Sequence, residues 1–225
     1  MQTLTPMTAD RRALHRIPEL GDELPKTMDY LQNVLGTLGC EVFFPLDSAV
    51  CAYFDFGAAD TLAFRAEMDA LPIAEQTGLP FSSQHSGRMH ACGHDGHTAI
   101  LLGAAKILKE HLDEVHGRII LFFERAEENG GGIPQMLAYM DEKGLKPDTV
   151  WGIHLYAGLE SGKMGLLDGG TMASVFGFNV TIHGKGGHGS RPDQANSPID
   201  CFVAIYNALE AARLTKITPF QPLTV

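Results

Sequence analysis

Hydrophobic and polar residues in the first part of the chain follow spacings that predict one helix and then three short strands. Between residues 22 and 38, apolar side chains recur every three or four positions, with Pro25 in the first turn and Gly39 just past the end. This spacing is typical of an amphipathic surface helix. Runs rich in β-branched and aromatic residues then predict strands, and they cover 41–44, 50–56 and 61–67. A loop rich in Pro, Gly and Ser follows over residues 69–88.

The middle of the chain alternates helical patterns with continuous apolar runs. Helices are predicted at 98–112 and 133–143, and fully buried strands at 118–124 and 149–155. Strands that alternate with helices at this spacing predict an α/β fold, with a largely parallel or mixed sheet flanked by helices. In such sheets, functional side chains collect at the carboxyl ends of the strands.

A different pattern begins beyond residue 170. Apolar side chains there alternate with small or polar ones, which predicts a strand with one solvated face; they are Phe176, Phe178, Val180 and Ile182. A glycine-rich turn leads into a predicted helix over 197–214, with Ser197 as N-cap and Pro198 at its first position. One strand and one helix cannot bury each other's apolar faces, so we expect this second unit to be incomplete.

Composition narrows the class of protein and its partners. The chain has 225 residues, 44% hydrophobic and 20% charged, so disordered and collagen-like architectures are excluded. Lys+Arg 17 against Asp+Glu 27 leaves a net charge of −10 without any basic run, so we expect no nucleic acid and no membrane as partner. No apolar run is long enough for a membrane helix or a signal core, so we expect a cytoplasmic location. Three scattered cysteines are expected to be reduced and buried: Cys40, Cys51 and Cys201.

The segment HACGHDGH, residues 90–97, carries the strongest indication of chemistry. Three histidines, a thiol and a carboxylate lie within these positions, and all are groups that bind divalent cations. Cys92 and His94 are two apart, so a tight turn can aim both at one cation. Asp95 and His97 are expected to open the next helix, where a carboxylate suits the helix dipole. The alternative is a capping segment with exposed imidazoles.

A pair of adjacent carboxylates, Glu127 and Glu128, follows the predicted buried strand. Their repulsion is unfavourable unless a cation or a shared proton offsets it. Because successive side chains diverge, one can bind metal while the other acts as a general base. On an ordinary loop both would simply be solvated.

Two further histidines are candidates. His154 lies near the end of a predicted buried strand and by itself would be interpreted as a hydrogen-bonded core residue, but the two other clusters of potential metal ligands at strand ends favour a ligand role. His188 lies in a glycine-rich turn that could present its ring to something outside its own unit.

Other catalytic schemes fit these residues less well. A Cys92 nucleophile would need an orienting partner and an oxyanion hole. The PCxxC element of zinc deaminases and the glycine-rich nucleotide-binding motifs do not occur in the sequence. The alternative from another class is a catalytically incomplete module that only binds metal or forms dimers.

Six segments, in order, carry a family resemblance: RRALHRIPEL (11–20), RAEMDALPI (65–73), MHACGHDGHT (89–98), AEENGGG (126–132), GIHL (152–155) and HGKGGHGSRP (183–192). Together they resemble the metal-dependent amidohydrolases that include hippurate hydrolase, auxin-conjugate amidohydrolase and N-acetyldiaminopimelate deacetylase, with the aminoacylases and carboxypeptidase G. The resemblance implies a metallo-amidohydrolase that cleaves the amide bond of N-acyl amino acids or related conjugates. It also implies a catalytic α/β domain, whose N-terminal part is residues 1–172, and a lid domain that forms homodimers and begins with residues 173–225.

The resemblance also implies roles for single residues. Two divalent ions, Zn, Mn, Co or Ni, would be held by four ligands, which are Cys92, His94, Glu128 and His154. Glu127 is similar to the general base, and Asp69 to the aspartate that orients a ligand from behind. His188 matches the lid histidine that, in relatives, reaches the partner subunit's active site and helps to hold the oxyanion.

The sequence departs from the family pattern in two places. The segment FFERAEEN replaces the glutamine-proline motif that is more usual just before the acidic pair. Arg125 and Asn129 are therefore expected to change the local electrostatics without removing the pair. Relatives also continue well beyond this length, to a last histidine ligand. We therefore expect the chain to be a fragment of a longer protein, with four of the five protein ligands and weak activity by itself.

Overall fold

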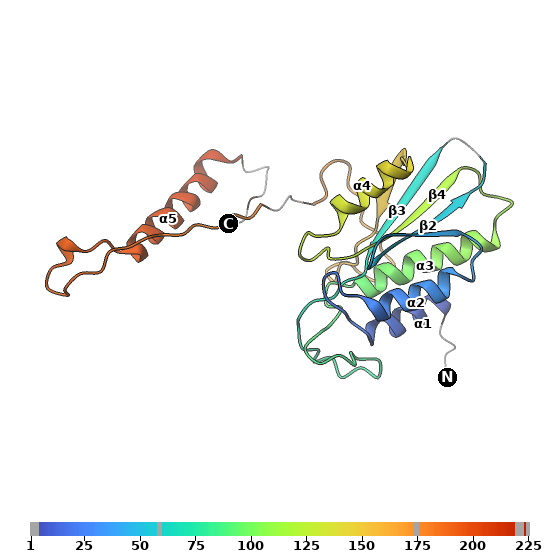
Figure 1. Cartoon of the computed structure of the whole chain (residues 1–225), viewed down its shortest axis with the longest axis horizontal. Helices are drawn as coiled ribbons and strands as arrows, with labels where there is room; N and C mark the ends of the chain where they lie inside the picture. Colours follow the sequence, from blue (N-terminus) through green and yellow to red (C-terminus); the bar gives the residue numbers. More distant parts are fainter. Residues whose placement is uncertain (1–4, 58–59, 173–175, 219–222, 224–225) are drawn as a thin grey trace. The chain divides into compact units, whose positions relative to one another are not determined.

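A computed structural model describes residues 5–57, 60–172, 176–218 and 223 of the chain. They divide into two compact units, Met1–Gly158 and Leu159–Val225 (Figure 1). The division falls earlier in the chain than the expected domain start at residue 173, which lies outside the described residues. The roles expected for the two domains stay predictions.

A five-stranded mixed sheet lies at the centre of the first unit, in the order β1-β2-β4-β3-β5 (Figure 1). Its strands are β1 (Glu41–Leu46), β2 (Ala49–Asp55), β3 (Thr61–Glu67), β4 (Arg118–Glu124) and β5 (Thr149–Gly152). β1, β2 and β4 pair antiparallel, whereas β4, β3 and β5 run parallel. The predicted α/β class with a mixed sheet is confirmed, and the bounds expected for β3 and β4 agree with the structure.

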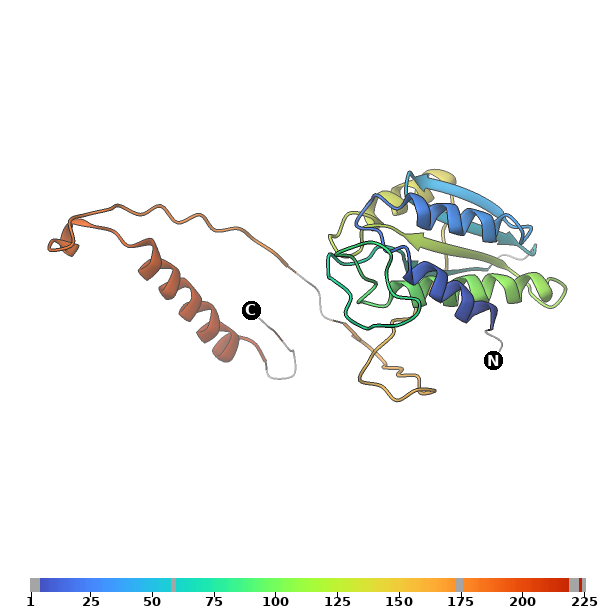
Figure 2. The ribbon, with the colours of Figure 1, turned by 90° about the horizontal axis from the view of Figure 1, so that it is seen from below.

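Helices cover both faces of this sheet (Figures 1 and 2). On one face α2 (Pro25–Leu35) and α3 (His94–Glu110) pack on a core that includes Val50, Leu121 and Phe123, and α1 (Pro6–His15) packs on α3. On the other face α4 (Ile133–Lys143) brings Met136 and Met140 against the sheet. Alternate residues of one strand reach opposite cores, as the pleat requires.

The ends of several helices differ from the sequence prediction. The first helix, α1, was not predicted; its N-cap Thr5 accepts a hydrogen bond from the backbone N–H of Thr8 at 3.3 Å. α2 stops at Leu35 and is capped by Gly36. α3 begins four residues early, at His94, so its first turn is part of the HACGHDGH segment. Gly93, the N-cap of α3, has a φ of 95°, a left-handed conformation that glycine adopts without steric cost.

The prediction of a buried strand over 149–155 is wrong in both length and burial. β5 ends at Gly152, and all four of its residues are exposed. It is an edge strand that pairs with β3. A continuous apolar run therefore marked a strand correctly here but could not show its place in the sheet.

The second unit contains one long helix, α5 (Pro198–Lys216), after a short 3-10 turn (Pro192–Gln194). Ser197 caps α5 by accepting a hydrogen bond from Asp200 N at 3.2 Å, as predicted. The strand predicted over 176–182 does not form, because no neighbouring strand pairs with it in the described part of this unit. Cys201 is exposed rather than buried. No helix within the described residues is both long enough and apolar enough to cross a membrane.

Candidate metal centre

The carboxyl ends of the parallel strands bring the candidate residues together. Glu67 and Glu124 end β3 and β4 at paired register positions, so the loops after them leave the sheet at one edge. The N-terminus of α3 packs beside β3 at this edge, with Thr98 Oγ1 donating to the Glu67 carbonyl at 2.8 Å. This placement follows from the sheet topology, as the sequence analysis expected.

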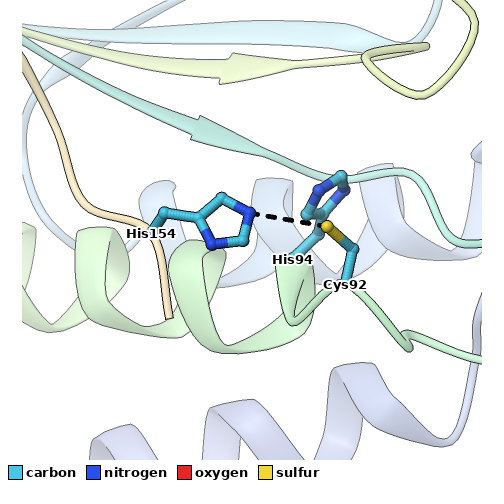
Figure 3. Close-up of side chains that lie close together, drawn as sticks. All are labelled: Cys92, His94 and His154. Carbon is cyan, nitrogen blue, oxygen red and sulfur yellow. Dashed lines mark hydrogen bonds between the residues drawn. The ribbon is translucent and has the colours of Figure 1, made fainter. Parts of the chain in front are cut away.

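Cys92 and His154 meet at this edge (Figure 3). Cys92 Sγ lies 3.4 Å from His154 Nε2, and with His94 these residues offer three ligand atoms within 4.8 Å of one another. His154 Nδ1 donates to the Leu155 carbonyl at 2.7 Å. Because that nitrogen carries the proton, the lone pair of Nε2 points toward Cys92.

His94 belongs to all three groups of potential metal ligands among the described residues. It is 1% exposed, and its Nδ1 donates to the Asp69 carbonyl at 2.8 Å. Its Nε2 lies 3.9 Å from Glu127 Oε2 and 3.8 Å from Glu128 Oε1, too far for hydrogen bonds. The nitrogen that faces the acidic pair is thus left free for a cation.

Asp69 ties the acidic loop to the helix. The carboxylate is buried, and its Oδ2 accepts a hydrogen bond from Glu128 N at 3.1 Å. Its Oδ1 lies 3.4 Å from His94 Nδ1 and has no hydrogen-bond partner among the described residues. One side chain therefore contacts segments that carry two of the expected ligands.

A strained turn aims the acidic pair. Ala126 is buried and has a φ of 55°, a left-handed conformation that costs a non-glycine residue about 1–2 kcal/mol. Its N–H donates to the Gly21 carbonyl at 3.0 Å, and its own carbonyl accepts from Gly131 N at 3.0 Å. A Cβ at Gly132 would lie 2.0 Å from the Arg125 carbonyl oxygen, so only glycine fits there.

The electrostatics of this cluster favour a positive charge. Burial raises the pKa of the Cys92 thiol to about 11, and the charges of Glu128, Glu127 and Glu67 add to that rise. Burial alone would lower the pKa of His94, but its interaction with Asp69 and the charge of Glu67 raise it above the ordinary value. Cys92 and His94 thus hold their protons more strongly than usual, and a divalent cation bound to them would take the place of those protons.

The donor set fits divalent metal ions. Three groups of potential ligands have their atoms within 4.8 Å of one another: Cys92, His94 and His154; His94, Glu127 and Glu128; and Glu67, His94 and His97. Thiolate, imidazole and carboxylate together suit zinc, and imidazole with carboxylate also suits manganese, cobalt or nickel. The structure therefore brings together five of the seven expected site residues around one another, with Asp69 directly behind His94.

His188 lies in the second unit. It is exposed, and its Nδ1 lies 2.9 Å from Ser190 Oγ. Its expected role toward a partner subunit stays a prediction.

Sequence reasoning missed a buried network behind the cluster. Asp95 is not a free helix-capping carboxylate: its Oδ2 accepts a hydrogen bond from His15 Nδ1 at 2.8 Å and forms an ion pair with Arg11, whose Nε lies 2.8 Å away. His15 Nε2 lies 3.2 Å from Glu75 Oε1. The i, i+4 spacing of Arg11 and His15 places both on one side of α1. This spacing is the feature of the sequence that could have indicated the network. The pairing of Glu67 with His97 was also missed.

Comparisons with known proteins identify sequences and structures similar to this chain. The model of peptidase family M20/M25/M40 matches residues 63–222. The N-acetyl-L-cysteine deacetylase of Bacillus subtilis is 39% identical over 94% of this chain and 51% of that protein. The N-acyl-L-amino acid amidohydrolase of Geobacillus stearothermophilus is 38% identical over 98% of this chain and 60% of that protein. The chain thus spans about half the length of the curated relatives it matches.

A solved structure resembles the described fold as well. A Bacillus subtilis protein, described as a dinuclear metal-binding peptidase of the M20 family, superposes with a TM-score of 0.62 at 35% identity. The superposition covers 66% of this chain and 42% of that one. The mixed sheet and its flanking helices are therefore an architecture that a metal-binding protein shares.

Proposed function

The chain belongs to peptidase family M20/M25/M40, and on that premise we propose that it is the metal-binding part of a hydrolase that cleaves the amide bond of N-acyl amino acids or related acyl-amine conjugates. The relatives named above, a deacetylase and an amidohydrolase, support this substrate class. The observation that carries the proposal is the convergence of Cys92, His94, His154 and the acidic pair at one edge of the sheet.

In this proposal, two divalent ions are held by the groups that surround His94. Cys92 and His154 provide one side of the site, and Glu128 the other. Bound there, such ions would polarise the substrate carbonyl and make a nearby water more acidic. Asp69 keeps His94 and Glu128 in place through its carbonyl and its carboxylate.

Glu127 is the proposed general base. Its carboxylate lies 3.9 Å from His94 Nε2, is 38% exposed, and so can contact both the cluster and incoming substrate. It would accept the proton of the attacking water at a carboxylate oxygen. It would then donate that proton to the nitrogen of the departing amine, so that the carboxylate is restored.

The test combines metal analysis with a screen of N-acyl amino acids. We expect hydrolysis that a chelator abolishes and a divalent ion restores. Glu127→Gln should reduce turnover by about 10²- to 10⁴-fold and leave metal content unchanged, while Glu142→Gln, on the exposed end of α4, should change neither. Full turnover in Glu127→Gln would show that the base is assigned wrongly.

The second candidate function is a metal-binding or dimerisation module without catalysis. The 225 residues match 51–60% of the length of these relatives. A module without catalysis is therefore a second candidate function for this chain by itself. It predicts tight metal binding with no hydrolysis in the same screen, whereas the hydrolase proposal predicts both.

The identity of the metal, the dimer and the cellular location are further proposals. The metal is proposed to be zinc, manganese, cobalt or nickel, because these ions suit the donor set. A homodimer through the second unit, with His188 reaching a partner's site, and a cytoplasmic location are proposed from the sequence resemblance and composition.

A further inference from the structure

His97 belongs to the HACGHDGH segment, yet the proposed hydrolysis does not use it. The ring is buried, with Nδ1 2.8 Å from Glu67 Oε2 and Nε2 2.9 Å from Leu155 N. A carboxylate only accepts hydrogen bonds and a backbone N–H only donates them. The two partners therefore require a neutral ring with its proton on Nδ1, and they use both ring nitrogens.

This arrangement argues against a direct ligand role for His97. One ring nitrogen of His97 and atoms of Glu67 and His94 lie within 4.8 Å of one another and so resemble a third cation site. However, the lone pair of Nε2 already accepts the Leu155 amide proton, and Nδ1 carries the proton given to Glu67. A cation could bind His97 only after one of these hydrogen bonds broke.

The hydrogen bond from Leu155 restrains the segment that carries His154. Residues 153–155 lie beyond the end of β5 and are exposed, and no strand among the described residues pairs with them. The His97 and His154 rings meet edge to face with centroids 4.6 Å apart. Leu155 Cδ1 also packs so closely on α3 that a Cβ at Gly96 would lie 2.4 Å from it. Three contacts from the first turn of α3 thus hold this short segment.

Glu67, the partner of His97 Nδ1, is held in place by Arg65. Arg65 donates from Nη1 to Glu67 and from Nε to Glu124. Glu67 Oε1 accepts from Arg65, and Glu67 Oε2 faces His97 Nδ1. Because a carboxylate paired with a guanidinium only accepts hydrogen bonds, the proton between Glu67 and His97 lies on Nδ1. A continuous chain of hydrogen bonds runs from β4 through Arg65, Glu67 and His97 to the Leu155 amide.

We propose that His97 is a positioning residue: Glu67 sets its tautomer, and its Nε2 holds the Leu155 amide so that His154 presents Nε2 beside Cys92. The consequence for metal binding rests on the proposed function. The hydrogen bond itself does not, so it can be tested without metal.

The first experiment titrates the 225-residue chain with Co²⁺. His97→Phe keeps a ring but no nitrogen, and it should weaken Co²⁺ binding about 10- to 100-fold while the Cys92 thiolate-to-cobalt absorption band persists at saturation. His97→Gln keeps an acceptor near the position of Nε2 and should bind close to wild type. The matched control is Thr98→Val, which removes the hydrogen bond from Thr98 Oγ1 to the Glu67 carbonyl without touching Leu155; it should also bind like wild type.

Glu67→Gln tests the tautomer directly. Its amide oxygen must face Arg65, so its NH₂ faces His97 Nδ1 and moves the ring proton to Nε2. That proton would then meet the Leu155 N–H, donor against donor. We expect Glu67→Gln to weaken Co²⁺ binding as His97→Phe does, and long-range ¹H–¹⁵N spectra to show the Nε2–H tautomer in place of the wild-type Nδ1–H tautomer.

Hydrogen exchange of the Leu155 amide in metal-free protein separates this proposal from the proposed function. Exchange should be slow in wild type, His97→Gln and Thr98→Val, and faster in His97→Phe and Glu67→Gln. Unchanged exchange in His97→Phe overturns the positioning role, as does His97→Gln binding Co²⁺ as weakly as His97→Phe. If wild type binds no Co²⁺ but the exchange pattern holds, the metal centre is refuted and the positioning contact stands.

Discussion

Cys92 and His154 are 62 positions apart in the chain, yet Cys92 Sγ lies 3.4 Å from His154 Nε2 (Figure 3). The contact arises because β5 runs parallel to β3 and ends at the edge where α3 begins. Neither residue's immediate neighbours in sequence establish it. A cation shared by the two side chains would therefore link α3 to the segment after β5.

We expect Cys92→Ala to lose most of the thermal stabilisation that added Zn²⁺ provides. A ligand that binds only the folded state at 100 times its Kd stabilises by about 2.7 kcal/mol, and loss of a thiolate donor raises that Kd. The measurement is the shift in Tm on adding Zn²⁺. Cys201→Ala, at an exposed cysteine of α5, is the matched control; equal shifts in the two variants would rule out Cys92 as a ligand.

Two glycines of α3 should respond differently to alanine. Gly103→Ala meets only ordinary contacts, with Met7 Sδ at 3.5 Å, so helix propensity should stabilise the protein by about 1 kcal/mol. Gly96→Ala would place Cβ 2.4 Å from Leu155 Cδ1, so Leu155 must move and the gain should disappear. Urea unfolding measures both changes, and Co²⁺ titration should show weaker binding for Gly96→Ala alone. Identical behaviour of the two variants would mean that Leu155 does not pack on Gly96.

The left-handed backbone of Ala126 predicts an unusual order of substitutions. Ala126→Gly relieves the strain but adds freedom to the unfolded chain, so the unfolding free energy should change by less than about 1 kcal/mol. Ala126→Val places a branched side chain in a left-handed, buried position and should destabilise by about 2 kcal/mol or more. Equilibrium unfolding in urea checks the order. A valine variant as stable as the glycine variant would contradict the conformation described for Ala126.

Glu75 should make the folded state sensitive to acid. Burial would raise the pKa of Glu75, but hydrogen bonds from Ser83 N, Thr77 Oγ1 and His15 lower it from 4.5 to about 2. Because the folded-state pKa is depressed, this carboxylate stabilises the protein above about pH 4.5, and that contribution is lost as the pH falls toward 2.

Glu75→Gln should therefore destabilise the protein by about 2 kcal/mol at pH 7 and flatten the dependence of stability on pH between about 4.5 and 2. Unfolding free energies across this range provide the measurement, with the exposed Glu142→Gln as control. A slope in Glu75→Gln as steep as that of wild type would show that other carboxylates cause the acid sensitivity.

Local pattern determined much of the scaffold. The bounds of β3, β4 and α4 follow from apolar runs and from glycine and proline at their ends, because side-chain period and turn residues act over a few positions. The candidate ligands were also found locally, since thiol, imidazole and carboxylate groups rarely gather without something to bind. Chemical groups that lie close together in the sequence can be recognised from that short segment alone.

Tertiary structure decided everything that depends on a partner distant in sequence. The run at 149–155 was expected to be buried, but β5 is exposed because it lies at the edge of the sheet. The alternating segment 176–182 pairs with no strand in the described part of the chain. Likewise, only packing tied Asp95 to α1 and His97 to both Glu67 and Leu155. The physical reason is that burial and hydrogen bonding are properties of pairs, so a residue's tautomer and exposure are set only once the fold has supplied its neighbours.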